Sequence, residues 1–331
     1  MPKKILFVSA YKTSFVKKDY EILNQYFKVD TLFLTKKYSK VNKLLVHFVK
    51  ILLKITKNEI IFVWFADYRA FLAVLLAKIL KKKTVIVAGG YELEDLPEFN
   101  YGGLRSLFAK KRLKFTLKNA DKVLTVDESL KYEIINKLFL KADNVTTLPT
   151  GYDSDKFVSN QPKEKLVITV AAVKKLNSLR IKGLDIFIEV AAELPEYDFM
   201  IIGCQGEAYE WLEKKSSSNV KIKQYLPQSE LINFYKKARV YCQLSIREGL
   251  PNALCEAMLC KCVPIGTRTH GIPKAIGKTG FLTDYNDFKA IKHAIVKAIS
   301  SNRGDLARNR IIKLFNLGTR TTDLIKVINE L

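Results

Sequence analysis

Residues 245–258 read SIREGLPNALCEAM and follow an apolar run, VYCQL, at 240–244. The apolar run predicts a strand, and the glycine and proline after it predict a tight loop that leads into a helix. Pro251 suits the first turn of that helix, because its missing N–H group would have no partner there. Gly249 lets the loop backbone approach a ligand closely. The N–H groups at the start of the helix favour a phosphate or a sugar oxygen.

Two glutamates lie on either side of this predicted helix start. Glu248 is in the loop, and Glu256 is about one turn into the helix. Carboxylates in these positions can accept hydrogen bonds from hydroxyl groups at the two ends of one polar ligand. A nucleotide sugar is such a ligand, because it joins a hexose to a ribose through two phosphates. The stretch therefore predicts a site for a nucleotide sugar.

The same residues resemble a known family. The pattern Glu-Gly-x-Pro-x-x-x-x-Glu at 248–256, followed by VPIGT at 263–267, resembles the donor-site motif of retaining GT-B glycosyltransferases of family four, the glycosyltransferase group 1 type. The resemblance implies that Glu248 contacts the donor hexose and that Glu256 holds the ribose hydroxyls. It also implies that the loop between them binds the sugar and the phosphates through Gly249, Leu250, Pro251 and Asn252.

A second stretch resembles another donor element of that family. Lys182-Gly183 precedes an amphipathic helix, as does the family's lysine that contacts the diphosphate. The resemblance implies a catalytic role for Lys182 and for a neighbouring cation, which is either Arg180 or Lys174. Leu226, in a Leu-Pro-Gln segment after a predicted strand, falls where relatives contact the nucleobase.

The N-terminal half alternates short apolar strands with helices, which predicts a doubly wound α/β sheet. Ligands of such sheets bind beyond the carboxyl ends of the strands. Gly89, Gly90 and Tyr91 follow the strand at 84–88, so we expect them on the acceptor side. The double glycine indicates either a close approach to a ligand or a simple tight turn. Other residues expected beyond strand ends are Tyr11, Lys12 and residues 65–67.

The chain is long enough for two domains. We predict an N-terminal Rossmann-like, acceptor-binding domain at 1–160 and a C-terminal Rossmann-like, donor-binding domain at 161–314. A helix at about 315–331 is expected to pack back on the first domain. The resemblance implies the GT-B fold, in which two doubly wound domains face a central cleft.

The charge of the chain indicates an anionic partner. The formal net charge is +23, and 48% of the residues are hydrophobic. Basic amphipathic helices expected at 43–54 and 104–118 favour an anionic membrane surface, although a surface helix packed on the core has the same periodicity. The chain lacks a signal-peptide pattern and an apolar run long enough to span a membrane. We therefore expect a cytoplasmic protein, peripheral on the inner face of the cell membrane.

Five cysteines, an odd number without scaffold spacing, favour a reducing compartment. Cys255, Cys260 and Cys262 cluster, but no histidine pair accompanies them. We expect small core residues rather than a zinc site. No metal and no cofactor is expected beyond a UDP- or GDP-linked sugar as co-substrate.

The resemblance implies metal-independent, retaining transfer of a hexose-type sugar to a glycan or lipid-linked acceptor, in surface polysaccharide biosynthesis. A non-catalytic glycosyltransferase-like subunit is an alternative, because many relatives carry a histidine near the sugar and this chain has none at the strand end at 84–88. A basic nucleic-acid-binding protein is disfavoured, because no known module and no cationic face interleaved with aromatic residues is evident.

Overall fold

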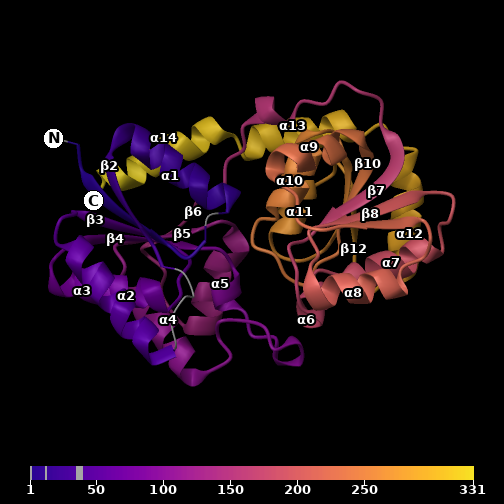
Figure 1. Ribbon diagram of the computed structural model, residues 1–331. Coiled ribbons are helices and arrows are strands. Elements are labelled where there is room, and N and C mark those ends of the chain that lie inside the picture. Colours follow the sequence, from indigo (N-terminus) through magenta and orange to yellow (C-terminus); the bar gives the residue numbers. More distant parts are fainter. Residues whose placement is uncertain (1, 12, 35–39) are drawn as a thin grey trace. The chain divides into compact units, whose positions relative to one another are not determined.

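The computed structural model describes residues 2–11, 13–34 and 40–331, which form two compact units (Figure 1). The first unit comprises Met1–Thr150 and Gly318–Leu331, and the second comprises Gly151–Leu317. The predicted boundary at 160 lies later in the chain than this division. The backbone of Tyr152 explains the difference, because its N–H donates to Phe315 and its carbonyl accepts from Leu317.

The first unit is built on a parallel sheet of six strands in the order β2-β1-β3-β4-β5-β6. The strands are β1 (Lys4–Ser9), β2 (Lys28–Phe33), β3 (Ile60–Trp64), β4 (Lys83–Ala88), β5 (Lys122–Thr125) and β6 (Val145–Thr147). All residues of β3 are buried, as are all but the first of β1 and of β4. Continuous apolar strands of this kind are typical of a sheet with helices on both faces.

The helices of the first unit divide between the two faces of the sheet. α1 and α14 lie on one face, and α2, α3 and α4 lie on the other (Figure 1). The helices and 3₁₀ turns are α1 (Ser14–Tyr26), α2 (Lys40–Ile55), α3 (Tyr68–Ile79), η1 (Tyr91–Leu93), η2 (Pro97–Phe99), α4 (Leu107–Asn119), α5 (Glu128–Leu138) and α14 (Leu317–Asn329).

A buried ion pair holds α14 against the first unit. The guanidinium of Arg320 donates to both carboxylate oxygens of Asp19 in α1, at 3.1 Å and 2.6 Å. It also donates to the carbonyls of Leu148 and Pro149, while the indole of Trp64 donates to Asp19. Arg320 and Asp19 are each 2% exposed. A buried charge needs such complete pairing, because its hydration has been removed.

The second unit contains another parallel sheet of six strands, in the order β12-β11-β10-β7-β8-β9. The strands are β7 (Glu164–Val170), β8 (Asp198–Ile202), β9 (Val220–Lys223), β10 (Ala238–Gln243), β11 (Val263–Thr267) and β12 (Phe281–Thr283). The helices and one 3₁₀ turn are η3 (Ser154–Phe157), α6 (Leu176–Ile181), α7 (Leu184–Ala192), α8 (Gly206–Lys215), α9 (Gln228–Lys237), α10 (Asn252–Leu259), α11 (Gly271–Ile276), α12 (Phe288–Ile299) and α13 (Gly304–Leu314).

Each sheet has a point where the chain reverses its direction of travel across the strands. The reversal occurs between β1 and β3 in the first unit and between β7 and β10 in the second. Loops on the two sides of such a point diverge and leave a crevice at the carboxyl ends of the strands. The predicted doubly wound α/β fold is thus confirmed in both units. Among the described helices, none is both long and apolar enough to cross a bilayer.

Candidate functional site

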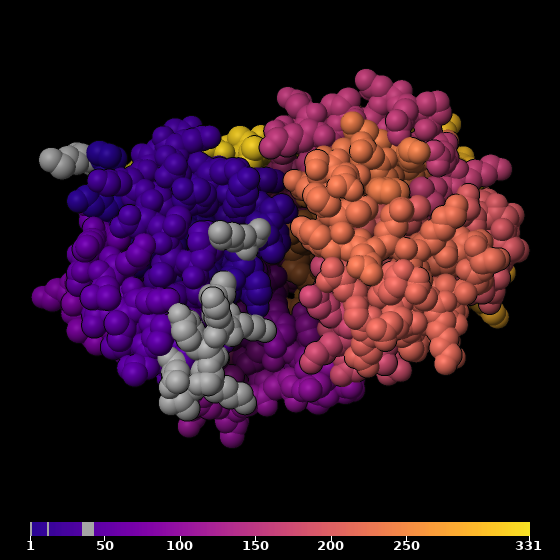
Figure 2. All heavy atoms as spheres, in the orientation of Figure 1, coloured from indigo at the N-terminus to yellow at the C-terminus, as the bar shows by residue number. Residues whose placement is uncertain are grey.

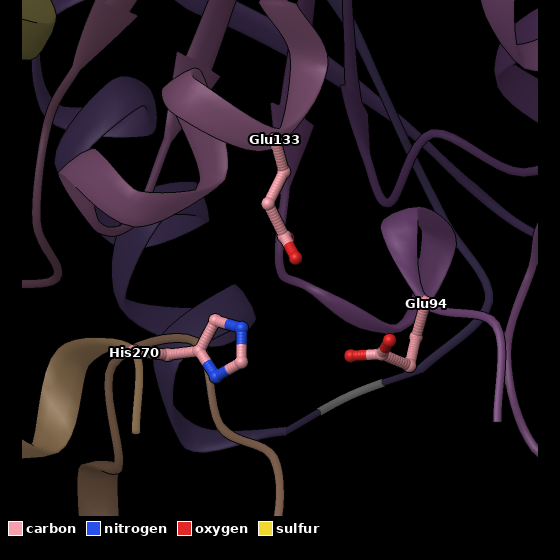
Figure 3. Close-up of side chains that lie close together, drawn as sticks. All are labelled: Glu94, Glu133 and His270. Atoms are coloured by element: carbon pink, nitrogen blue, oxygen red, sulfur yellow. The ribbon is translucent and has the colours of Figure 1, made fainter. Parts of the chain in front are cut away.

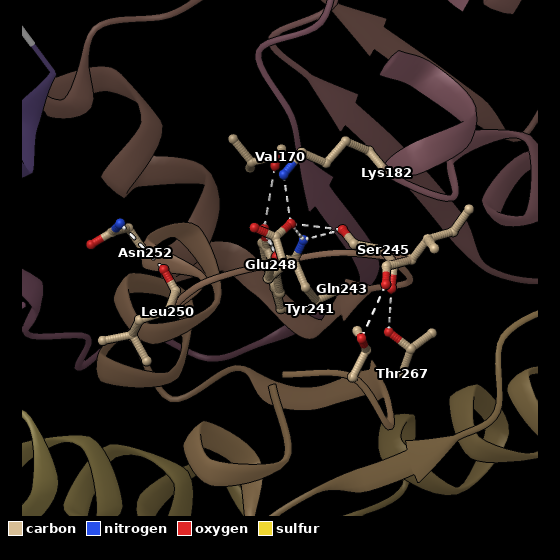
Figure 4. Close-up of polar contacts among 11 residues, drawn as sticks. Val170, Lys182, Tyr241, Gln243, Ser245, Glu248, Leu250, Asn252 and Thr267 are labelled. Carbon is tan, nitrogen blue, oxygen red and sulfur yellow. Dashed lines mark hydrogen bonds and ion pairs between the residues drawn. The ribbon is translucent and has the colours of Figure 1, made fainter. Parts of the chain in front are cut away.

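The reversal point of the second unit brings Lys182 and Glu248 together. Lys182 ends α6, the first helix after β7, and Glu248 lies in the loop after β10. The Lys182 Nζ atom is 2.6 Å from the Glu248 Oε1 atom (Figure 4). Because β7 and β10 are neighbours in the sheet, their following loops meet although the two residues are 66 positions apart.

Two further polar side chains hold Glu248. The amide of Gln243 and the hydroxyl of Ser245 donate to the same Oε1 atom, at 2.9 Å and 2.8 Å (Figure 4). Tyr241 donates to the Gln243 carbonyl oxygen at 3.2 Å and so orients that amide. The other oxygen of Glu248, Oε2, has no hydrogen bond to any residue that the structure describes. This oxygen could therefore accept a hydrogen bond from a hydroxyl group of a ligand.

The Lys-Gly pair has a clear structural cause. Gly183 adopts the left-handed conformation, with φ of 65°, as the N-cap of α7. A Cβ atom at this position would lie 2.1 Å from the carbonyl oxygen of Leu244, which follows β10. A glycine therefore lets the two loops pass in contact, and this contact places Lys182 beside Glu248.

The loop that precedes α10 packs closely against Gly271, the first residue of α11. A Cβ atom there would lie 2.2 Å from the carbonyl oxygen of Gly249, which accepts the Gly271 N–H at 3.2 Å. Pro251 is the N-cap of α10 rather than part of its first turn. The helix therefore begins one position later than predicted, at Asn252. Leu250 is buried, and Asn252 accepts a hydrogen bond from the Tyr152 hydroxyl at 2.7 Å.

Glu256 has a partner that the sequence did not reveal. Its carboxylate, 6% exposed, accepts a hydrogen bond of 2.6 Å from the amide of Gln228. Gln228 follows Leu226 by two positions at the start of α9, so the predicted nucleobase segment lies beside Glu256. Leu226 itself is half-buried.

The structure does not bring the two candidate second cations into the Lys182–Glu248 pair. Lys174 and Arg180 are both exposed, and no ion pair of either side chain occurs within the described residues. Arg180 lies near Asp185 and Tyr285 instead. Burial raises the pKa of the Asp185 carboxyl and that of the Tyr285 hydroxyl, the latter to about 12, and Arg180 partly opposes both shifts.

The double glycine at the end of β4 forms a tight turn. The Glu92 carboxylate accepts the N–H groups of Ala66, Gly89 and Gly90 at 2.8–3.1 Å, so one buried side chain closes the turn. A Cβ atom on Gly89 would lie 2.8 Å from the Phe65 ring. Packing against protein therefore accounts for Gly89, while an approach of this turn to a ligand stays a prediction.

Tyr91 lines a cavity of about 240 Å³ within the first unit. The Tyr91 ring is 53% exposed and packs edge-on against Tyr101. Asp67 and Arg112 also line the cavity, and burial lowers the pKa of Arg112. Tyr11 is exposed near the end of β1, and Lys12 lies outside the described residues.

The acidic residues Glu94 and Glu133 of the first unit share a lysine. Lys137 Nζ lies 3.4 Å from the Glu94 carboxylate and 2.7 Å from that of Glu133. The lysine already supplies positive charge where a metal ion would bind, so we assign no metal to these carboxylates. Figure 3 draws both glutamates, and also His270, which belongs to the second unit and there contacts Arg247 and Thr269.

The three clustered cysteines are core residues, as predicted. Cys255, Cys260 and Cys262 are fully buried, and Cys262 donates to the carbonyls of Tyr235 and Ala238. Burial raises the pKa of the Cys260 thiol to about 12 and also raises that of Cys262.

Comparison with known proteins finds a family model that is similar to the second unit. Residues 152–313 match the family model described as glycosyl transferases group 1. The matched range contains Lys182, Glu248 and Glu256, so the donor-like cluster lies inside the family's own domain.

The relatives are distant. A phosphatidylinositol N-acetylglucosaminyltransferase subunit of Arabidopsis thaliana is 24% identical over 243 residues, which cover 69% of this chain and 54% of that protein. O-antigen chain mannosyltransferase B of Escherichia coli is 23% identical over 255 residues, which cover 68% of this chain and 65% of that protein. The chain thus spans about half the length of the Arabidopsis protein.

Solved structures show the fold. Anabaena Alr3699/HepE in complex with UDP and glucose matches with a TM-score of 0.80 and 15% identity, over 99% of this chain and all of that one. Together with the two parallel six-stranded sheets, this likeness confirms the GT-B type of fold.

Proposed function

We propose that the protein is a retaining glycosyltransferase that moves a hexose-type sugar from a UDP- or GDP-linked donor to a glycan or lipid-linked acceptor. The observation that carries this proposal is the Lys182–Glu248 pair at the strand-reversal point of a glycosyltransferase group 1 domain. The bound UDP and glucose named for the Anabaena structure support a nucleotide-sugar donor.

Lys182 and α10 would stabilise the leaving group. In the proposed reaction the acceptor oxygen bonds to the anomeric carbon while the bond from that carbon to the diphosphate breaks. The acceptor proton passes to an oxygen of the departing diphosphate, on the same face of the sugar. The ammonium of Lys182 and the positive end of the α10 dipole offset the charge that develops there.

The two glutamates would bind opposite ends of the donor. Glu248 presents Oε2 to a hexose hydroxyl, while Oε1 is held by its three partners. Glu256, which is held by the Gln228 amide, would accept hydrogen bonds from the ribose hydroxyls. Arg180 and Lys174 are both exposed and remain the candidates for a second diphosphate contact.

The acceptor would bind to the first unit. The cavity beside Tyr91 offers an aromatic ring, the Asp67 carboxylate and the Arg112 guanidinium. Aromatic faces and charged groups of this kind bind the apolar faces and the hydroxyls of sugars. We propose that the acceptor belongs to a surface polysaccharide pathway and that the enzyme works at the inner face of the membrane, without a metal.

Nucleotide binding tests the donor site. Unfolding temperature measured with UDP, GDP, ADP and uridine should rise with one nucleoside diphosphate, because a ligand of the folded state stabilises it. Lys182→Ala should weaken binding of that diphosphate by about tenfold to hundredfold, as expected for a lost charge-assisted hydrogen bond, and leave uridine binding unchanged.

Matched variants complete the test. Lys175→Ala removes another exposed lysine of the same loop, and Glu189→Ala removes an exposed glutamate of α7. Both should retain sugar transfer, whereas Lys182→Ala and Glu248→Ala should lose it while remaining folded. Near-normal transfer by either of the latter two would refute the proposed roles. Diphosphate binding without any transfer would favour a non-catalytic subunit.

A further inference from the structure

Helix α2 exposes apolar side chains on the side that faces solvent. Leu45, Val49 and Leu53 recur every four residues, lie along one strip of the helix, and are 65%, 42% and 64% exposed. Leu44 beside them is 50% exposed. The opposite strip, which includes Ile51, packs into the core. A surface helix usually presents polar residues to water, so α2 departs from the common pattern.

Helix α4 repeats this feature at its start. Leu107 and Phe108 are 80% and 72% exposed. Both helices cover the same face of the sheet, with α3 in contact with each of them (Figure 1). Figure 2 shows the segment that holds α2, α3 and α4, coloured indigo to purple, at the surface of the first unit. We call Leu44, Leu45, Val49, Leu53, Leu107 and Phe108 the docking face.

The charged side chains of the three helices themselves have one sign. The sequences of α2, α3 and α4 contain lysines and arginines but no aspartate or glutamate. On the other face, α1 and α14 contain both signs. On α4, Lys111 and Lys114 are exposed beyond the two apolar residues. Exposed leucines on helices whose own charged side chains are all cationic are complementary to a surface that is apolar inside and anionic outside.

We propose that the docking face binds an anionic lipid bilayer, with the leucines and Phe108 inserted among the acyl chains and the lysines at the headgroups. Lysine stems are apolar, so their ammonium groups reach the headgroup level while the helix lies in the interface. This binding requires neither a nucleotide nor the proposed transfer reaction. Its failure would therefore leave the donor site untouched.

Vesicle binding by the full chain tests the proposal. The protein is sedimented with vesicles of phosphatidylcholine alone, or of phosphatidylcholine mixed with phosphatidylserine, at low and high salt. We expect binding to the mixed vesicles that weakens at high salt, because ions screen the lysines. Leu45→Gln with Leu53→Gln should weaken binding by about tenfold or more, through lost apolar burial. Lys111→Glu with Lys114→Glu should weaken binding to mixed vesicles specifically.

A matched control uses exposed leucines elsewhere. Leu306 and Leu314 of α13 are 58% and 39% exposed on the second unit. Leu306→Gln with Leu314→Gln should bind vesicles like the unaltered protein. Unfolding temperature and UDP binding should be the same in all three double variants, because every altered side chain is exposed and distant in sequence from the donor site.

Three results would overturn the proposal. The first is no binding to the mixed vesicles at low salt. The second is an equal loss of binding in the α13 control. The third is a concentration-dependent dimer, seen by sedimentation velocity and abolished by the Leu45→Gln and Leu53→Gln changes, because a second copy would then cover the docking face.

Discussion

Glu248 shows how neighbouring side chains can fix one oxygen of a carboxylate. Three donors converge on Oε1, one of them the ammonium of Lys182. This arrangement fixes the carboxylate and leaves Oε2 exposed to a ligand. The sequence motif predicted Lys182 and Glu248, but it did not include Gln243 and Ser245. A partial signal was present, because Tyr241 and Gln243 alternate at the end of β10 and so share one side of the strand, whereas Ser245 lies in the loop after it.

Asp185 provides a pH-dependent prediction. Burial raises the pKa of its carboxyl, and its Oδ1 atom is buried without a hydrogen bond to any described residue. The folded chain thus holds this proton more tightly than the unfolded chain does. Stability is lost as the pH rises through the unfolded and then the folded pKa. Asp185→Asn should raise the unfolding temperature at pH 7 by about 1–3 °C, a modest value because the group is partly solvated.

The same substitution supplies its own control. At a pH below the unfolded pKa, Asp185 is protonated in both states, and Asp185→Asn should leave the unfolding temperature unchanged. Scanning calorimetry of both proteins across acidic and neutral pH measures the difference. A stabilisation that is equal at every pH would mean that the carboxyl charge has no part in it.

The helices and strands follow the predicted pattern with shifts at their ends. The helix predicted from residue 104 begins at Leu107, because Ser106 caps it by accepting the Ala109 N–H. Leu104 is buried although it precedes the helix, so its apolar side chain matched the helical periodicity and placed the predicted start too early. By contrast, α2 begins at Lys40, before the predicted residue 43. Caps and buried loop residues depend on tertiary contacts, which local spacing does not contain.

The anchoring of α14 can be tested at its ion pair. Arg320→Leu leaves Asp19 buried without its cation, and should lower the stability of the first unit by about 3–5 kcal/mol. Chemical denaturation in a Trp211→Phe background, in which Trp64 is the remaining tryptophan, measures the change by fluorescence. Adding Asp19→Asn should recover part of the loss, because no uncompensated charge then remains. A double variant as unstable as the single one would show that packing, rather than charge, holds α14.

The whole chain carries two sheets, each with its own core and its own reversal point. The first unit is assembled from both ends of the sequence, since Gly318–Leu331 joins Met1–Thr150. The donor candidates all lie in the second unit, and the acceptor candidates Gly89, Gly90 and Tyr91 lie in the first. The central cleft of the GT-B prediction and the membrane partner stay predictions.

Calorimetry with UDP tests this division of roles. Because each unit has a separate core, we expect two unfolding transitions, and the nucleotide should raise only that of the second unit. The stabilisation should be about 2.7 kcal/mol at a UDP concentration one hundred times the dissociation constant. For diphosphate binding that is tenfold to hundredfold weaker, Lys182→Ala should reduce that stabilisation to about 1.4 to about 0.4 kcal/mol at the same UDP concentration. Movement of both transitions, or of the first alone, would contradict a donor site in the second unit.

Local sequence was enough for the α/β rhythm, the Lys-Gly and Glu-Gly-x-Pro elements, and the cationic helices, because each depends on residues a few positions apart. The tertiary structure alone brings Lys182 to Glu248, 66 positions away, and Asp19 to Arg320, 301 positions away. Gln228 became a partner of Glu256 in the same way. Contacts between distant segments decide which residues are buried, which are paired and which apolar strips stay exposed. Spacing along the sequence does not specify which segments will meet.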